Sequence, residues 1–320
     1  MEGYRSCRLC EWQCGVDRLQ GETGVCRVGQ AEVAATMCSA SLRSYIVTLA
    51  GCCYRCLHCN AYRISQYPDP GWYYAGYVPP AVLVADAKER ITAFEGPSIH
   101  TISFTGGDPI IHLPPYIREV ACEVDRQELG CGIGLSTGGF ATQETMAETV
   151  RFCDVITLEI KAYSDGLHRA LTGAPVAPVL RNAEYLVHEG REKIRVLRTV
   201  VIPGMTDGEV VAIAEFIASL DATVPYRLIG FRPNNVLYYH PPGPSRDEME
   251  RLCEMCREAG LSDVAWSGYY PESVPDEVAI EAARLRDAYG GDDAAALTAG
   301  YAAVTGCPTH PPELRHLPAA

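Results

Sequence analysis

Three cysteines, Cys52, Cys56 and Cys59, have a spacing that suits them to chemistry. They form a C-x3-C-x2-C run, and three thiolates this close can ligate three irons of a cubane [4Fe–4S] cluster, which normally has four ligands. The fourth iron is then open to a substrate or cofactor. A catalytic cluster needs such an open iron, and a cluster that only stores electrons does not. A zinc loop or a redox pair is the alternative for the run taken alone. The neighbouring Cys53 occupies one of the variable positions of this run and is expected to be a packed thiol.

The apolar stretch 45–50 directly precedes this run. It predicts a strand, with the cysteines in the loop at its carboxyl end, where α/β barrels keep their active sites.

The run and its strand resemble those of the radical S-adenosylmethionine (SAM) superfamily, whose signature has this spacing. The resemblance implies that SAM chelates the open iron through its amino and carboxylate groups. It also implies that the reduced cluster cleaves SAM into methionine and a 5′-deoxyadenosyl radical, which abstracts a hydrogen atom from a substrate.

A glycine-rich turn follows the next predicted strand, in the sequence Ser103-Phe104-Thr105-Gly106-Gly107-Asp108-Pro109. Two glycines allow the backbone to approach a ligand closely, although this sequence is also a common strand-to-helix turn. It resembles the Gly-Gly-Glu-Pro motif of the superfamily, with Asp108 in place of glutamate. The resemblance implies that Gly106, Gly107 and Asp108 contact the amino group of SAM.

Later strand ends resemble those of the activases of glycyl-radical enzymes. Ser136 begins a segment similar to one near the SAM ribose, and Glu159-Ile160-Lys161 resembles an Asp-x-Lys whose lysine faces the SAM carboxylate. Arg198 occupies the place of a SAM-contacting arginine. Arg227 stands where a histidine is usual.

These charges are of the kinds that a bound zwitterion needs. Asp108 and Glu159 suit its ammonium or ribose hydroxyls, and Lys161 and Arg198 suit its carboxylate. A surface ion pair or a polar strand end is the alternative for each.

A second cysteine set, Cys7, Cys10, Cys14 and Cys26, has the spacing C-x2-C-x3-C-x11-C. Four thiolates can form a closed tetrahedral site for zinc or rubredoxin-like iron. The segment is too short to bury a hydrophobic core without such a metal crosslink. We expect a structural site here, with free reduced thiols or a second [4Fe–4S] cluster as alternatives. Cys38, Cys253 and Cys256 are expected to be packed thiols.

The cysteine-rich segment and the run that continues through 60–66 together resemble the radical SAM members of the AmmeMemoRadiSam group. The similarity spans roughly residues 5–270. It implies the chemistry but not the substrate.

Strand-like and helix-like segments alternate from about residue 43. Strands are predicted at 44–50, 101–104, 132–136, 155–160, 193–202 and 226–231, with a short one near 263–266. Helices are predicted at 80–95, 114–129, 142–153, 178–189, 207–220 (capped by Asp207), 246–259 and 275–289.

This alternation implies parallel βα units. About six units are too few for an eight-unit barrel, so we expect a partial, open (β/α)6 barrel, which is also the fold of the radical SAM family. The expected division is a cysteine-rich metal-binding segment at 1–42, the barrel at 43–270 and a helical, proline-rich extension at 271–320.

Composition limits the partners and the compartment. The 320 residues include 27 basic and 40 acidic ones, for a net charge of −13, which disfavours nucleic acid as a partner. No apolar run approaches the ~20 residues of a membrane span, and no signal peptide is recognised. The 15 cysteines therefore favour metal ligation in a reducing cytoplasm over disulfides, and oxygen sensitivity is expected.

Two enzyme reactions and one non-enzymatic role compete. In the first reaction, the radical abstracts hydrogen from a protein or peptide, to activate or modify it, with flavodoxin or ferredoxin as reductant. In the second, bound cobalamin allows methyl transfer to a protein residue, as in methyl-coenzyme M reductase; the chain lacks an Asp-x-His-x-x-Gly cobalamin signature. The third is an Fe–S or zinc scaffold, which the three-cysteine run disfavours.

Overall fold

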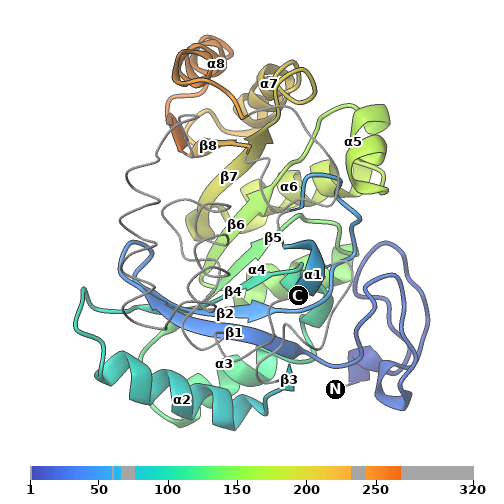
Figure 1. The fold of residues 1–320 in the computed structure, drawn as a ribbon, viewed down its shortest axis with the longest axis vertical. Helices are drawn as coiled ribbons and strands as arrows, with labels where there is room; N and C mark the ends of the chain where they lie inside the picture. Colours follow the sequence, from blue (N-terminus) through green and yellow to red (C-terminus); the bar gives the residue numbers. More distant parts are fainter. Residues whose placement is uncertain (1, 60, 66–75, 232–242, 268–320) are drawn as a thin grey trace, which may run out of the picture.

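The computed structural model describes residues 2–59, 61–65, 76–231 and 243–267 (Figure 1). The extension at 271–320, with its predicted helix at 275–289, lies outside the described residues.

A mostly parallel sheet organises the described chain (Figure 1). Its strand order is β3-β1-β2-β4-β5-β6-β7-β8-β9. The parallel strands are β2 (Ser44–Leu49), β4 (Thr101–Gly106), β5 (Gly132–Thr137), β6 (Val155–Glu159), β7 (Ile194–Val201), β8 (Tyr226–Gly230) and β9 (Val264–Ser267). The sheet has two edges, β3 and β9, so it is an open barrel, and the predicted α/β partial barrel is confirmed.

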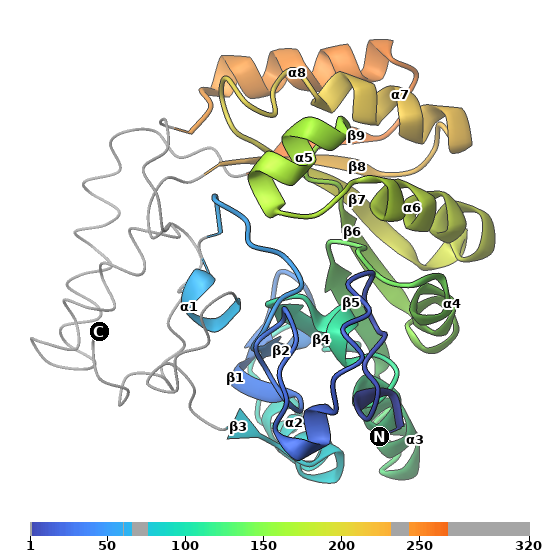
Figure 2. The same cartoon turned by 90° about the vertical axis from the view of Figure 1, so that its right-hand side faces the viewer.

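Helices line the outer face of this curved sheet (Figure 2). They are α2 (Pro80–Thr92), α3 (Ile117–Arg126), α4 (Gln143–Phe152), α6 (Ala177–Glu189), α7 (Val210–Leu220) and α8 (Arg246–Glu258). Two shorter helices, α1 (Tyr62–Ser65) and α5 (Asp165–Thr172), belong to the loops at the carboxyl ends of β2 and β6.

Side-chain alternation explains why the two faces of the sheet differ. In β4, Ile102 and Phe104 are fully buried, and Phe104 packs against Tyr116 beside α3. The alternate residues Ser103 and Thr105 are only half-buried on the inner face. In β4 the apolar side thus faces the helices, and the inner side carries hydroxyl groups.

Three features of the fold differ from the sequence-based prediction. Strand β1 (Glu32–Ser39) pairs antiparallel with β2, and the short β3 (Gly76–Tyr77) pairs with β1. Helix α5 was not predicted either. The predicted cap at Asp207 is wrong, because α7 begins after Glu209, without a side-chain cap. The Glu209 carboxylate instead accepts the backbone N–H groups of Tyr163 and Ser164, each at 2.7 Å.

None of the helices within the described ranges combines the length and apolar content needed to cross a bilayer.

Candidate active site

The loop after β2 carries Cys52, Cys56 and Cys59 at the carboxyl edge of the sheet, as predicted. Cys52 and Cys56 are each 8 % exposed, and Cys59 is half-buried. Helix α5 fixes the loop, because its last carbonyls accept the N–H groups of Arg55 and Leu57 at 2.8 and 2.9 Å. We call residues 50–59 the cysteine loop.

The glycine turn after β4 makes room for the cysteine loop. A Cβ on Gly107 would overlap the carbonyl oxygen of Gly51, and Gly106 has a φ of +103°, which favours glycine. The N–H groups of Gly107 and Asp108 donate to Leu49 and Gly51 at 2.8 and 3.0 Å. The two glycines are therefore required by backbone packing, whether or not they also contact SAM.

Asp108 is buried and its carboxylate is occupied by groups of the chain. It accepts the Thr137 hydroxyl at 2.6 Å and the N–H groups of Gly138 and Ile110 at 3.0 and 3.3 Å. The Cys53 thiol donates to it at 3.7 Å. Burial raises the pKa of Asp108, and these hydrogen bonds oppose that rise. Asp108 joins the ends of β4 and β5; its contact with SAM stays a prediction.

The other predicted SAM residues meet at the ends of β5, β6 and β7. Glu159 Oε1 forms an ion pair with Lys161 Nζ, and Glu159 Oε2 pairs with Arg198 Nε at 2.9 Å. Arg198 Nη2 also donates to Ser136 Oγ at 3.2 Å. The Glu159 and Lys161 side chains are only 12 % and 13 % exposed. We call Ser136, Glu159, Lys161 and Arg198 the charged cluster.

The electrostatics keep the charged cluster ionised. Burial alone would raise the pKa of Glu159, but the positive charges of Lys161 and Arg198 hold it well below its usual range. Burial alone would lower the pKa of Lys161, but the charge of Glu159, and then that of Cys56, raise it. Two cations and one carboxylate leave one net positive charge, which suits an anionic group such as a carboxylate.

The charged cluster lies beside the cysteine loop. Lys161 Nζ is 5.5 Å from the centroid of the Tyr54 ring, and its charge acts on Cys56 and Cys52. Burial raises the pKa of the Cys56 thiol well above its usual value, and Lys161 opposes this. The Tyr54 N–H donates to Cys52 Sγ at 3.4 Å. An N–H donor and a nearby cation both stabilise negative charge on thiolate ligands of a cluster.

Arg227 lies apart from the charged cluster. It is level with Arg198 in the sheet, but its Nη1 pairs with Asp263 Oδ1 at 2.8 Å and donates to the Asp263 and Tyr226 carbonyls. Its guanidinium is thus directed to the chain before β9.

The predicted four-cysteine site remains untested. Cys7, Cys10 and Cys26 are buried and Cys14 is exposed. Within the described ranges, no three His, Cys, Asp or Glu side chains are grouped to hold a metal ion. This applies equally to the cysteine loop, so both ligand sets stay predictions. The packed thiols at Cys53, Cys253 and Cys256 are confirmed, and Cys38 is half-buried.

A buried network that sequence reasoning missed connects the N-terminal segment (residues 2–31) to the cysteine loop. Arg18 is 2 % exposed, lies 4.4 Å from the Tyr4 ring centroid and donates to Ile111 O at 2.7 Å. Tyr4 Oη and Arg18 Nη2 lie 2.8 and 3.3 Å from His112 Nδ1. Burial, and then Arg18, lower the pKa of His112, so the ring is neutral and its Nε2–H donates to Ala50 O at 3.3 Å. No motif in the sequence signals this network.

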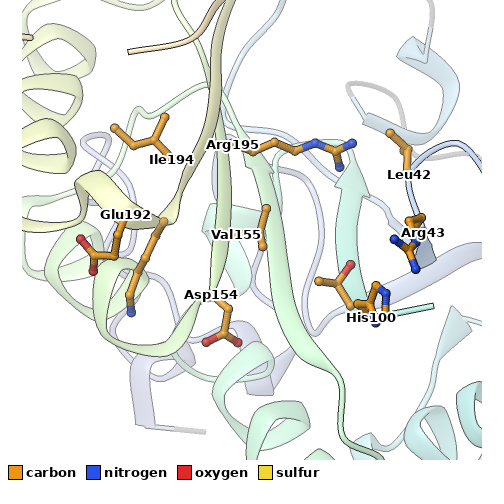
Figure 3. Close-up of a pocket in the computed structure, with 10 residues that line it drawn as sticks. Leu42, Arg43, His100, Asp154, Val155, Glu192, Ile194 and Arg195 are labelled. Carbon is orange, nitrogen blue, oxygen red and sulfur yellow. The ribbon is translucent and has the colours of Figure 1, made fainter. Parts of the chain in front are cut away.

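A cavity of about 340 Å³ opens at the opposite, amino edge of the sheet (Figure 3). Its lining includes Arg43, His100, Asp154 and Arg195, next to the starts of β2, β4, β6 and β7. It is separate from the cysteine loop, and active sites of α/β barrels lie at the carboxyl edge instead.

Comparisons with known proteins agree with this geometry. The sequence model of the radical SAM superfamily matches residues 46–217, more than half of the chain. The pyruvate formate-lyase-activating enzyme of Staphylococcus aureus is 25 % identical over 198 residues, covering 58 % of this chain and 74 % of that protein. The crystal structure of a radical SAM methyltransferase from Sphaerobacter thermophilus has a similar fold, with a TM-score of 0.55 and 18 % identity, covering 76 % of this chain and 70 % of the other. The chain belongs to the radical SAM superfamily.

Proposed function

We propose that this protein holds a [4Fe–4S] cluster through Cys52, Cys56 and Cys59, cleaves SAM reductively and uses the 5′-deoxyadenosyl radical to abstract hydrogen from a protein or peptide. The observation that carries the proposal is the ionised charged cluster beside the cysteine loop. The relative in Staphylococcus aureus is named as an enzyme that activates another enzyme, which supports a protein substrate.

Each group of the site has a definable task in this proposal. Lys161 and Arg198 bind the SAM carboxylate, and Glu159 holds both cations in place before SAM arrives. Ser136 lies next to Arg198 and is available to a ribose hydroxyl. The bound cluster would supply the electron that cleaves the sulfonium. Because Glu159 already holds Lys161 and Arg198, their side chains need to rearrange little when SAM binds.

The glycine turn contributes backbone groups to the same site. We propose that Gly106, Gly107 and Asp108 border the amino group of SAM, through main-chain carbonyls because the Asp108 carboxylate is already occupied. A carbonyl oxygen is an adequate acceptor for an ammonium group.

The hollow face of the sheet suits a polar ligand. Thr105 of β4 and Thr157 of β6 are half-buried there, and Thr157 pairs in register with Ser136 of the charged cluster. Hydroxyl groups can serve as donors or acceptors to a nucleoside or to a peptide backbone. We propose that SAM and the substrate residue meet over this face, with flavodoxin or ferredoxin supplying the electron in the cytoplasm.

The four cysteines of the N-terminal segment have a separate, structural task in the proposal. Zinc or iron bound by Cys7, Cys10, Cys14 and Cys26 would stabilise the N-terminal segment, which already packs on the cysteine loop. Counting zinc and iron per chain after anaerobic purification tests this.

Anaerobic reconstitution tests the main proposal. With iron, sulfide, dithionite and SAM, the protein should form 5′-deoxyadenosine, and Cys56→Ala should form none because one cluster ligand is lost. Cys122→Ala is the matched control, since this thiol is exposed and lies on α3. Undiminished 5′-deoxyadenosine from Cys56→Ala would refute the proposal, and so would a fully loaded wild-type protein that leaves SAM intact.

The methyl-transfer alternative has its own test. The likeness to the methyltransferase of Sphaerobacter thermophilus is one of fold, and it does not select the reaction. A corrin absorption band that stays with the protein after methylcobalamin is added and excess is removed would favour methyl transfer over simple hydrogen abstraction.

A further inference from the structure

One peptide group of the cysteine loop is hydrogen-bonded at both ends. The carbonyl oxygen of Cys53 accepts Trp12 Nε1–H at 2.7 Å. The N–H of Tyr54, in the same planar peptide, donates to Cys52 Sγ at 3.4 Å. A side chain of the N-terminal segment is therefore connected to a predicted cluster thiolate through a single peptide plane.

The barrel holds Trp12 in place independently of its hydrogen bond to the cysteine loop. Residues next to it pair with the chain after β5: Cys10 forms a β-bridge with Ala141, and the Glu11 N–H donates to Phe140 O at 3.2 Å. The indole packs on the Phe140 ring, with centroids 5.3 Å apart. Phe140 is itself 1 % exposed, so the indole packs against a ring enclosed in the core, and its N–H is directed at the Cys53 carbonyl.

We propose that Trp12 is a positioning residue that fixes the Cys53–Tyr54 peptide so that its N–H points at the Cys52 thiolate. This inference rests on the proposed function, because it takes Cys52 to be a cluster ligand. A bond to the carbonyl polarises the peptide and strengthens donation by its N–H.

The expected consequence concerns the reduction potential. Hydrogen bonds to cluster sulfurs help to set it, and they stabilise the reduced, more negative state more than the oxidised one. Trp12 therefore makes the cluster easier to reduce. The rest of the loop has other anchors, since His112 Nε2–H donates to Ala50 O and Arg55 donates to Val25 O, so the loss of the indole N–H perturbs mainly one peptide.

The test compares midpoint potentials of reconstituted protein, followed by EPR. Trp12→Phe removes the N–H and part of the ring. Replacement of Trp12 by 3-benzothienylalanine removes the N–H and keeps the ring shape. Trp266→Phe is the matched control, because Trp266 lies in β9, far along the sheet from β2. Both Trp12 variants should have a more negative midpoint potential at full iron and sulfide content, and the control should match the wild type.

The outcomes separate this inference from the proposed function. A wild-type protein that assembles no cluster refutes the proposed function. Full clusters with an unchanged potential in the benzothienylalanine protein overturn the role of Trp12, even if Trp12→Phe differs, because ring packing would then be responsible. If the variants assemble no cluster, hydrogen exchange of the Tyr54 amide in the metal-free full chain decides: faster exchange supports the inference, and unchanged exchange overturns it.

Discussion

At the scale of single residues, the site depends on charges that are paired before any ligand binds. Glu159 is nearly enclosed between Lys161 and Arg198, whose charges offset the effect of burial on its pKa and keep it ionised. Breaking a buried pair costs more than the pair contributes, since the remaining charge is left without its partner.

Lys161→Met should therefore weaken SAM binding by at least about tenfold, or about 1.4 kcal/mol. The substitution removes the cation of the charged cluster that lies beside Tyr54 of the cysteine loop, and it leaves Glu159 with Arg198 alone. Isothermal titration of reconstituted protein with SAM measures the change. Arg169→Met is the control, because Arg169 forms an exposed pair with Asp165, and such pairs contribute little. Equal affinities for Lys161→Met and the wild type would remove Lys161 from the carboxylate site.

At the scale of elements, the cysteine loop is shaped by close backbone contacts with the turn after β4. Gly107 lies so near Gly51 that no side chain fits between them. This contact joins the carboxyl ends of β2 and β4, which are paired in parallel up to Leu49 and Gly106.

Gly107→Ala should destabilise the protein by about 3 kcal/mol, since the added methyl group meets main chain that cannot rotate away. It should also lower the iron retained after reconstitution, because the shift falls on the cysteine loop. Gly166→Ala is the matched control: Gly166 lies in the first turn of α5 with nothing within 4 Å of an added Cβ, and alanine is favourable there. Chemical denaturation and iron analysis measure both effects, and equal stabilities of the two variants would contradict the steric argument.

Sequence patterns predicted the parallel strands because short apolar segments alternate with helical segments along the chain. They missed β1, whose run of small residues at Val33, Ala34 and Ala35 is buried without alternation. They missed α5 because it is short and opens with Asp165 and Gly166.

Some residues of the candidate site could also be predicted from the sequence, and others could not. Residues at strand ends, such as Glu159 and Arg198, were predictable because parallel strands bring their carboxyl ends together. The roles of Trp12, Arg18 and His112 were not, since Trp12 and Cys53 are 41 positions apart and Arg18 and His112 are 94 positions apart. A motif that is local in sequence contains no information about such contacts.

At the scale of the whole molecule, the N-terminal segment is part of the barrel's packing. Val28 fills the space beside Gly51, where a Cβ would overlap it. Arg18 reaches Ile111 and His112, and Glu11 pairs with Arg181 of α6 at 2.5 Å. These contacts reach residues on both sides of the cysteine loop, so the segment and the barrel should share one unfolding transition.

A protein whose only tryptophan is Trp12, made by Trp72→Phe and Trp266→Phe, tests this directly. Trp12 fluorescence reports the N-terminal segment, and far-UV circular dichroism reports the barrel helices. The two thermal midpoints should coincide in the metal-free full chain, because loss of the segment would leave His112 buried beside an unfilled space and expose the Phe140 ring. The parent protein provides the control for the two phenylalanine substitutions. A fluorescence transition well below the circular dichroism transition would mean that the segment folds separately, and the cysteine loop would then have to keep its shape without it.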